Sequence, residues 1–354
     1  MKIKIISALL SLFLCVGITT ALSSCTDSED EKNTSDTSGE TVAETDEPPM
    51  ELATGDHLSY VFLNDGKYCA VIGLGAANGA IRIEIPEVYE GLPVIGISSD
   101  AFASSIHLKS VELPNSLKYI GNNAFEGCTN LESINIPESL EYLGSQAFDG
   151  CEKLPLTEYE NALYLGSESA PYTILMSAKD TAIDGVCTLH TDTKIINELA
   201  FADCTEIDEI IIPSGIRYIG LYAFENCYDL EFTRHDSIDY LGNESNPYLV
   251  CVEAIEKDNT LSYTIHENTK IIAPGAFAGC KKLEEVNIPN GLKTIGEFAF
   301  DDCPRMKTIA FDRISLWIVI DIEDFANTLY IENSDVNTKE MLLNTHKSCA
   351  WIRQ

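Results

Sequence analysis

Hydrophobic and polar residues follow one another along this chain in a frame that repeats every 23 residues. The pair Ala-Phe recurs with its alanine at positions 101, 124, 147, 200, 223, 276 and 299, and cysteine lies three residues after the phenylalanine in six of these seven copies. In the second copy the frame runs from Leu113 as LPNSLKYIGNNAFEGCTNLESIN. Because no single turn of such a chain buries its apolar face alone, the pattern predicts a repeat solenoid in which stacked coils share one core.

Each coil is expected to contribute a short strand. The segment Leu131–Ile136 ends in an alternation that places Ile134 and Ile136 inward, and Pro137 ends that strand. Gly144 is expected to permit a tight turn before the next Ala-Phe pair. Coils that rise by roughly 4.8 Å each predict an elongated array.

Two insertions interrupt the frame, near residues 155–187 and 231–263. They match each other at an offset of 76 residues, since NALYLGSESAPYTILMSAKD from Asn161 corresponds to SIDYLGNESNPYLVCVEAIE from Ser237. Each is expected to form a β-hairpin on one side of the stack, with its turn at residues 169–171 or 245–247.

The two inserted hairpins place tyrosines at equivalent positions. Tyr164 corresponds to Tyr240, and Tyr172 corresponds to Tyr248. Three interpretations are open: the rings pack across the strands of each hairpin, they stack on sugars of a bound glycan, or they insert into a pocket of a partner protein.

The two ends of the repeat region are expected to be capped. Residues 57–112 hold an N-terminal capping hairpin, turning around residues 64–66, together with the first repeat. Residues 113–311 form the solenoid, and residues 312–354 form a C-terminal cap with a short helix from about Asn337 to His346.

The N-terminal residues have the three regions of an export signal. Lys2 and Lys4 precede an apolar run from Ile5 to Ile18, and the sequence LSSC ends at Cys25. This ending resembles the lipobox of bacterial lipoproteins, which implies a signal peptide over residues 1–24 and lipidation of Cys25. Ordinary secretion with an incidental Cys25 is the alternative. Residues 25–56 are rich in Thr, Ser, Asp and Glu and are expected to be a disordered acidic tether.

The chain is strongly acidic, with a formal net charge of −33, and this charge disfavours partners that are themselves negatively charged. Nucleic acids and anionic membrane surfaces both attract clustered lysine and arginine, so the composition argues against either as a partner. Contact with a membrane is therefore expected only through the lipid anchor.

Twelve cysteines in an exported chain first suggest disulfides. Six of them occupy the same position of successive coils, where parallel side chains are poorly oriented for bridging, so buried free thiols are expected. These six are Cys128, Cys151, Cys204, Cys227, Cys280 and Cys303. The state of Cys69, Cys187, Cys251 and Cys349 is left open by the sequence. With no C-x-x-C pair and no cysteine-histidine cluster in the sequence, no metal site and no cofactor are expected.

Acidic residues recur at positions predicted to face outward on the strands. If these positions align, they form a negative surface that a basic protein partner would recognise, and a solvated charged face is the alternative. The residues are Glu112, Glu132, Asp208, Glu209, Glu284 and Glu285.

The recurring phrase Ile-Pro, Ile-Gly, Ala-Phe, Cys and Leu resembles the BspA-like (Treponema-type) leucine-rich repeat of bacterial surface proteins, over most of the chain after about residue 55. IPEVYEGLPVIGISSDAF from Ile85 resembles the usual first coil of that family. The resemblance implies a β-rich leucine-rich-repeat solenoid on a lipid-anchored cell-surface protein. It also implies a non-catalytic role in adhesion or binding to an extracellular protein of a host or a neighbouring cell. A glycan-binding module is the alternative function.

Overall fold

The computed structural model describes residues 50–64, 66–77, 79–311, 315–320, 329–332 and 341–353. All of them belong to one compact unit, Pro48–Gln354. The expected signal peptide, Cys25 and most of the acidic tether lie outside the described residues, as does the first part of the expected C-terminal helix.

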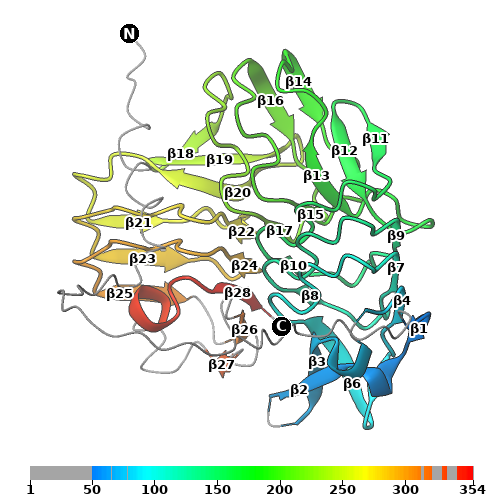
Figure 1. The fold of residues 1–354 in the computed structure, drawn as a ribbon. Coiled ribbons are helices and arrows are strands. Elements are labelled where there is room, and N and C mark those ends of the chain that lie inside the picture. The colour runs from blue at the N-terminus through cyan, green and yellow to red at the C-terminus, as the bar shows by residue number, and fades with distance from the viewer. Residues whose placement is uncertain are drawn as a thin grey trace, which may run out of the picture. The chain divides into compact units, whose positions relative to one another are not determined.

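Apart from three short helical turns, the regular structure of the described chain is all strand, and turns connect these strands into coils (Figure 1). One set, here called the outer strands, forms three separate parallel sheets with the orders β1-β4-β7-β9, β14-β16 and β21-β23-β25. The outer strands are β1 (Leu52–Ala53), β4 (Arg82–Glu84), β7 (Ser110–Glu112), β9 (Ser133–Ile134), β14 (Gly185–Thr188), β16 (Ile207–Ile211), β21 (Ser262–Thr264), β23 (Glu285–Ile288) and β25 (Thr308–Phe311). The predicted repeat solenoid is therefore confirmed.

The second set, here called the inner strands, also pairs in parallel and divides the coils into three stacks. The first stack has β6 (Leu92–Ile97), β8 (Tyr119–Ile120) and β10 (Tyr142–Leu143). The second stack has β15 (Ile195–Ile196) and β17 (Tyr218–Ile219). The third stack has β22 (Ile271–Ile272) and β24 (Thr294–Ile295).

Antiparallel hairpins begin each stack, as the sequence predicted for the N-terminus and the two insertions. Each hairpin ends in a strand that pairs in parallel with the first inner strand of its stack. Their strands are β2 (Ser59–Leu63) and β3 (Tyr68–Gly73), then β11 (Thr157–Tyr159), β12 (Ala162–Leu165) and β13 (Ile174–Ala178), then β18 (Thr233–His235), β19 (Ile238–Asn243) and β20 (Asn246–Ala254). A short strand, β5 (Val88–Tyr89), pairs antiparallel with β6, and two single 3₁₀ turns are η2 (Gly55–His57) and η3 (Gly75–Ala77).

The C-terminal segment closes the third stack with strands. β28 (Ala350–Arg353) pairs antiparallel with β24, and β26 (Leu316–Ile320) lies between β28 and β27 (Leu329–Glu332). Within the described residues, the expected helix is reduced to one π-helical turn, η5 (Met341–Thr345). The apolar run from Leu316 is a strand that extends the sheet of inner strands.

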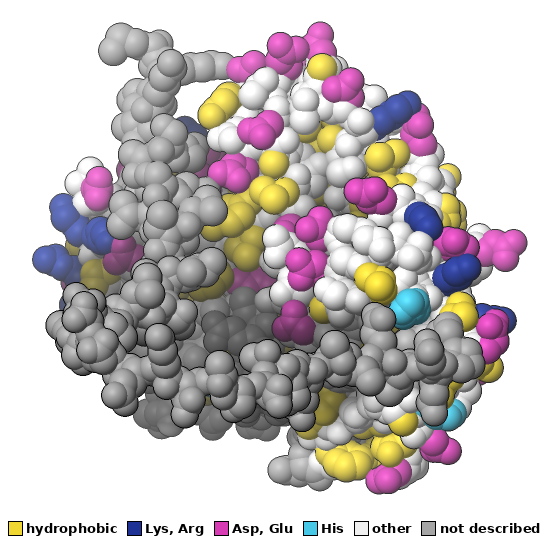
Figure 2. All heavy atoms as spheres, viewed as in Figure 1, with side chains coloured by type: hydrophobic (Ala, Val, Ile, Leu, Met, Phe, Trp, Pro, Cys, Tyr) yellow, Lys and Arg dark blue, Asp and Glu magenta, His cyan; other side chains and the backbone are white. Residues whose placement is uncertain are grey.

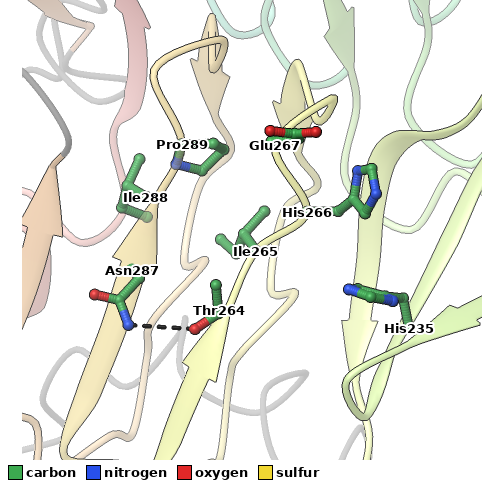
Figure 3. A pocket seen from close by; sticks show the side chains of 8 residues that line it. All are labelled: His235, Thr264, Ile265, His266, Glu267, Asn287, Ile288 and Pro289. Atoms are coloured by element: carbon green, nitrogen blue, oxygen red, sulfur yellow. Dashed lines mark hydrogen bonds between the residues drawn. The ribbon is translucent and has the colours of Figure 1, made fainter.

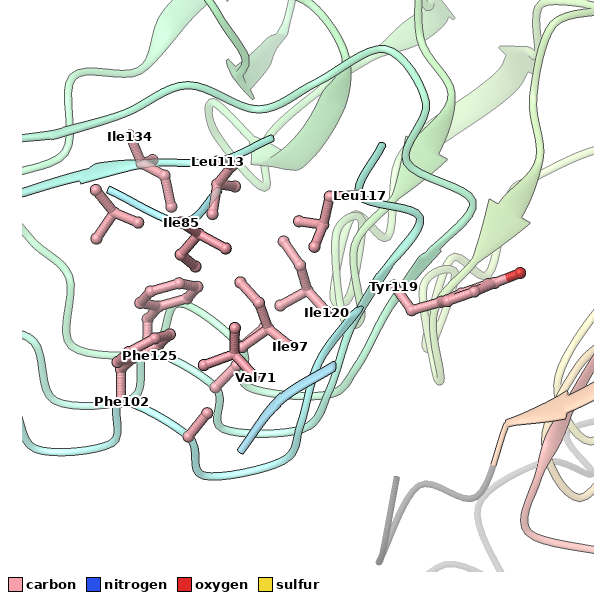
Figure 4. Packing of buried hydrophobic residues seen from close by; sticks show 14 of the residues in the cluster. Val71, Ile85, Ile97, Phe102, Leu113, Leu117, Tyr119, Ile120, Phe125 and Ile134 are labelled. Carbon is pink, nitrogen blue, oxygen red and sulfur yellow. The ribbon is translucent and has the colours of Figure 1, made fainter. Parts of the chain in front are cut away.

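The core of each stack is a set of columns that run through successive coils (Figure 4). Phe102 stacks on Phe125 with ring centroids 5.2 Å apart, and Phe125 stacks on Phe148 at 5.4 Å. The cysteine column lies beside the phenylalanines. The Cys128 thiol lies 3.1 Å from the carbonyl oxygen of Phe102, and Cys151, Cys227 and Cys303 repeat this contact at the same distance. At these four positions the repeated cysteine therefore joins its coil to the preceding one as a small buried donor.

We predict that all ten cysteines between Leu52 and Gln354 are free and protected in the folded protein. The structure shows each of them as a buried free thiol, including Cys69, Cys187, Cys251 and Cys349. Burial raises the pKa of the Cys187 and Cys227 thiols to about 12, so the reactive thiolate is scarce at these two positions. A thiol-reactive chromophore should leave the native protein unmodified and count ten thiols after denaturation without reductant. A count of eight or fewer would reveal a disulfide.

Glycine in the Ile-Gly phrase has a role different from the predicted one. Gly144 and Gly121 do not have positive φ angles, and a Cβ atom on either would collide with the backbone of the preceding coil. Left-handed residues lie instead at two other places in each of the seven coils. One is the residue before the Ala-Phe pair, where φ is between 54° and 68°, and the other lies two residues after the phenylalanine. The Ile-Gly glycine is thus required for the close approach of two coils.

The three stacks meet side by side, so the expected elongated array is wrong. The ring of Tyr142 in the first stack packs edge-on against Tyr218 in the second, with centroids 4.8 Å apart. Arg217 donates to the carbonyl oxygen of Leu140 at 2.8 Å, and the hydroxyl of Thr294 in the third stack donates to the carbonyl oxygen of Arg217 at 2.8 Å. The insertions therefore bend the solenoid, which brings coils about 76 residues apart into contact.

Candidate functional site

The six predicted outward acids lie on three different outer sheets. Glu112 ends β7 and Glu132 precedes β9 in the first sheet, Asp208 and Glu209 lie on β16 in the second, and the pair at 284–285 lies at the start of β23 in the third. All are exposed except Glu284, which is partly exposed. They are therefore accessible, but they belong to three sheets that are not hydrogen-bonded to one another.

Most of these carboxylates are not used by the fold. Among the described residues, only Glu284 of the six forms an ion pair, with Lys307 at 2.6 Å. Glu112 instead lies opposite Glu84 in the parallel register of β7 and β4, and both are exposed. Figure 2 shows acidic side chains spread over the visible face rather than gathered along one line.

The inner strands leave no free strand face, because each stack turns that face toward another. The first residue of each two-residue inner strand points away from its own coil, as Tyr119 does in Figure 4, yet it is buried. The buried positions are Tyr119, Tyr142, Ile195, Tyr218, Ile271 and Thr294. The repeat frame left this position variable, so its burial was not predicted from the sequence. The recurring Tyr-Ile-Gly or Tyr-Leu-Gly phrase at 119, 142 and 218 could have indicated it.

A buried carboxyl group lies where the three stacks meet. The hydroxyl of Tyr218 donates to Oε1 of Glu297 at 2.5 Å, and Glu297 is 2% exposed. Its Oε2 is buried with no hydrogen-bond partner among the described residues. Burial raises the pKa of Glu297 to about 7, and the hydrogen bond from Tyr218 only partly opposes this. We call Tyr142, Tyr218 and Glu297 the stack junction.

The four predicted hairpin tyrosines form two copies of one buried arrangement. Tyr164 and Tyr240 are fully buried, and their hydroxyls accept the backbone N–H of His190 and His266 at 3.3 and 3.1 Å. Tyr172 and Tyr248 each stack on that histidine, with ring centroids 3.8 Å apart in both copies. The rings of Tyr164 and Tyr240 are covered by protein, and one face of Tyr172 and of Tyr248 is covered by imidazole. The arrangement is that of cross-strand packing.

The two copies differ at one position, where His235 replaces Tyr159. His235 lies edge-on to His266 with centroids 5.1 Å apart, and both border a shallow hollow of about 330 Å³ (Figure 3). Glu267 lies at the upper end of the hollow, and Asn287 donates to the hydroxyl of Thr264 at 3.3 Å. Burial and the neighbouring His235 lower the pKa of His266.

The chemistry available on this surface is limited. Among the described residues, no group of three or more histidine, cysteine or acidic side chains is placed to hold a metal ion. Within the same residues, no helix has the length and hydropathy needed to cross a membrane. The described chain is thus a β solenoid with exposed acidic outer strands and a shallow hollow lined by histidines. Its stacked coils with repeated apolar columns define a leucine-rich-repeat type of protein.

Comparison with known proteins identifies the family. Residues 90–170, 185–247 and 252–349 match the BspA type leucine-rich repeat region in six copies, and the chain belongs to this family. No curated protein matches the chain.

Similar solved structures include bacterial leucine-rich-repeat proteins. A T. pallidum leucine-rich repeat protein is 21% identical with a TM-score of 0.33, over 72% of this chain and 91% of that chain. A leucine-rich cell surface protein from Faecalibacterium prausnitzii is 23% identical with a TM-score of 0.30, over 75% and 77%. The pneumococcal vaccine antigen PcpA is 17% identical with a TM-score of 0.21, over 73% and 69%.

Proposed function

We propose that this protein is an exported, non-catalytic leucine-rich-repeat protein that binds another extracellular protein, as an adhesin does. The observation that carries the proposal is the set of exposed carboxylates on all three outer sheets, most of which make no ion pair within the described chain. Side chains that the fold does not need are free to be selected for a partner. With a net charge of −33, the partner that fits is a basic protein surface.

Export and anchoring are the second part of this proposal. The apolar run and the LSSC sequence ending at Cys25 support lipidation of that cysteine and display at the bacterial cell surface. Two or more acyl chains, as lipoproteins carry, suffice for stable anchoring. Metabolic labelling with a fatty acid should label the wild-type chain and leave Cys25→Ser unlabelled.

We predict that reversing charges on the second outer sheet weakens partner binding. The experiment tests retention of the protein on a panel of extracellular-matrix and bacterial-surface proteins at low and physiological salt. The double change Asp208→Lys and Glu209→Lys should slow association with a retained partner by about tenfold, because opposite charges steer the encounter.

The matched control is the double reversal Asp149→Lys and Glu152→Lys, which makes the same charge change at exposed positions beside the Ala-Phe turn of the first stack. An equal effect of both reversals, or retention that disappears at physiological salt, would reduce the interaction to nonspecific charge. If the wild-type protein were retained by no member of the panel, that result would count against protein binding.

A further inference from the structure

At one turn position of the solenoid, some coils carry a residue type that the local backbone conformation disfavours. Only in the second stack is that residue both exposed and apolar or aromatic. The residue before each Ala-Phe pair adopts the left-handed conformation in all seven coils. Glycine, asparagine and aspartate adopt this conformation most readily, and bulky side chains do so at a cost in free energy. The residues at this position are Asp100, Asn123, Gln146, Leu199, Tyr222, Gly275 and Phe298.

Leu199 and Tyr222 are the departures that remain accessible. Leu199 is 47% exposed and Tyr222 is 51% exposed, with φ angles of 54° and 56°. Phe298, the third bulky residue, is only partly exposed, and its backbone N–H bonds to the carbonyl oxygen of Lys347 in the C-terminal segment. Exposure of apolar surface and an unfavourable φ both oppose folding at Leu199 and Tyr222, so neither residue is explained by stability.

The two residues lie in matching backbone positions on adjacent coils. The backbone N–H of Leu199 donates to the carbonyl oxygen of Leu221 at 3.0 Å, and that of Phe201 donates to the carbonyl oxygen of Ala223 at 2.8 Å. These two bonds bracket the pair, so Leu199 and Tyr222 occupy matching places in the ladder. Together they form a small apolar and aromatic patch at the turn of the second stack.

Two carboxylates border this patch. The N–H of Glu225 donates to the carbonyl oxygen of Tyr222 at 3.0 Å within the same turn, and Glu198 directly precedes Leu199. Burial raises the pKa of the Tyr222 phenol, and the charges of Glu225 and Glu198 raise it further. Both glutamates are partly exposed.

We propose that Tyr222, Leu199, Glu198 and Glu225 form a docking site for an arginine side chain of a partner protein. The planar guanidinium stacks on an exposed tyrosine ring and at the same time donates to carboxylates, which a lysine ammonium does less well. The side chain of Leu199 offers apolar surface to the methylene stem of the arginine. This site rests on the proposed function and names the contact residue of its partner.

The test measures binding of a fluorescent peptide of alternating glycine and arginine to the purified protein, by anisotropy at physiological salt. Peptides in which lysine or neutral citrulline replaces arginine are the ligand controls. The arginine peptide should bind most tightly. Tyr222→Asn should weaken its binding by about two- to fivefold. The same change should raise the melting temperature, because asparagine tolerates the left-handed conformation.

Glu225→Gln should also weaken binding, whereas Glu126→Gln should not. Glu126 is the equivalent residue of the second coil, three residues after Asn123, so it gives the same charge change without the tyrosine. Binding by Tyr222→Asn equal to wild type, or equal losses in Glu225→Gln and Glu126→Gln, would overturn the site. If the Tyr222→Asn variant still retained an extracellular protein as the wild type does, the arginine site would be overturned and the proposed function would stand. Peptide binding as expected, with no protein retained by wild type, would remove the proposed function alone.

Discussion

Replacing Gly144 with alanine is expected to destabilise the protein by about 3 kcal/mol, the upper end of the usual cost of overpacking. A Cβ atom on Gly144 would lie 2.5 Å from the carbonyl carbon of Gly121 and closer still to the backbone nitrogen of Asn122. Both are main-chain atoms of the preceding coil and are held there by the ladder: the N–H of Gly144 bonds to the carbonyl oxygen of Ile120 at 2.8 Å. The collision can be relieved only by separating two coils. Urea unfolding of wild type and variant would measure the loss.

Gly215→Ala provides the matched control for this experiment. A Cβ there meets the flexible end of Lys194 at 3.2 Å, and Gly215 does not have a positive φ angle. The expected change is under about 1 kcal/mol. If both substitutions cost the same, the close approach of coils at the Ile-Gly glycine would not be what requires glycine.

The stability of the folded protein is expected to fall as pH rises from about 5 to 8, through Glu297. The folded state raises the pKa of this group from an ordinary 4.5 to about 7, so between these values it holds a proton that the unfolded chain releases. Stability from this group is therefore fully present below pH 4.5 and is lost as pH rises through 7. A difference of this size corresponds to about 3 kcal/mol. The charged neighbour Glu198 raises the pKa of Glu297 further.

Glu297→Gln should remove this part of the pH dependence and should be more stable than wild type at pH 8. The amide keeps the size of the side chain and can still accept the hydrogen bond from Tyr218. The readout is the difference in unfolding free energy between variant and wild type at several pH values, which cancels the titration of the histidines. Glu152→Gln makes the same chemical change at an exposed position outside the stack junction and is the control. A pH-independent difference for Glu297→Gln would contradict the assignment.

The repeat frame alone was sufficient to predict the solenoid and its core. Phenylalanine and cysteine recur at fixed positions because each must meet its equivalent in the next coil, so the columns at Phe125 and Cys128 are visible in the sequence. The same logic predicted the inserted hairpins, because their duplication at an offset of 76 residues marks each as one structural unit. Contacts within a coil and between adjacent coils can therefore be predicted from the repeat period.

Contacts between stacks could not be predicted in this way. The bond from Tyr218 to Glu297 joins coils 79 residues apart, and the angle at which each insertion bends the solenoid decides whether they meet. That angle depends on how each hairpin packs against the coils, and the repeated residue pattern does not specify that packing. For the same reason the outward acids could be predicted as exposed, but their division among three sheets could not. Glu297 itself occupies an ordinary variable position of the frame, between glycine and phenylalanine.

Contacts between the stacks also limit how such a chain can change its length. In a simple array each coil contacts only its neighbours, so a gene can gain or lose one coil without disturbing the rest. Here Arg217 of the second stack bonds to the carbonyl oxygens of Glu138 and Leu140 in the first stack, and the hydroxyl of Thr294 in the third stack bonds to the carbonyl oxygen of Arg217. Loss of a single 23-residue coil would shift one side of these contacts against the other. Duplication of a whole 76-residue unit preserves their register, and that longer unit is the one this sequence contains twice.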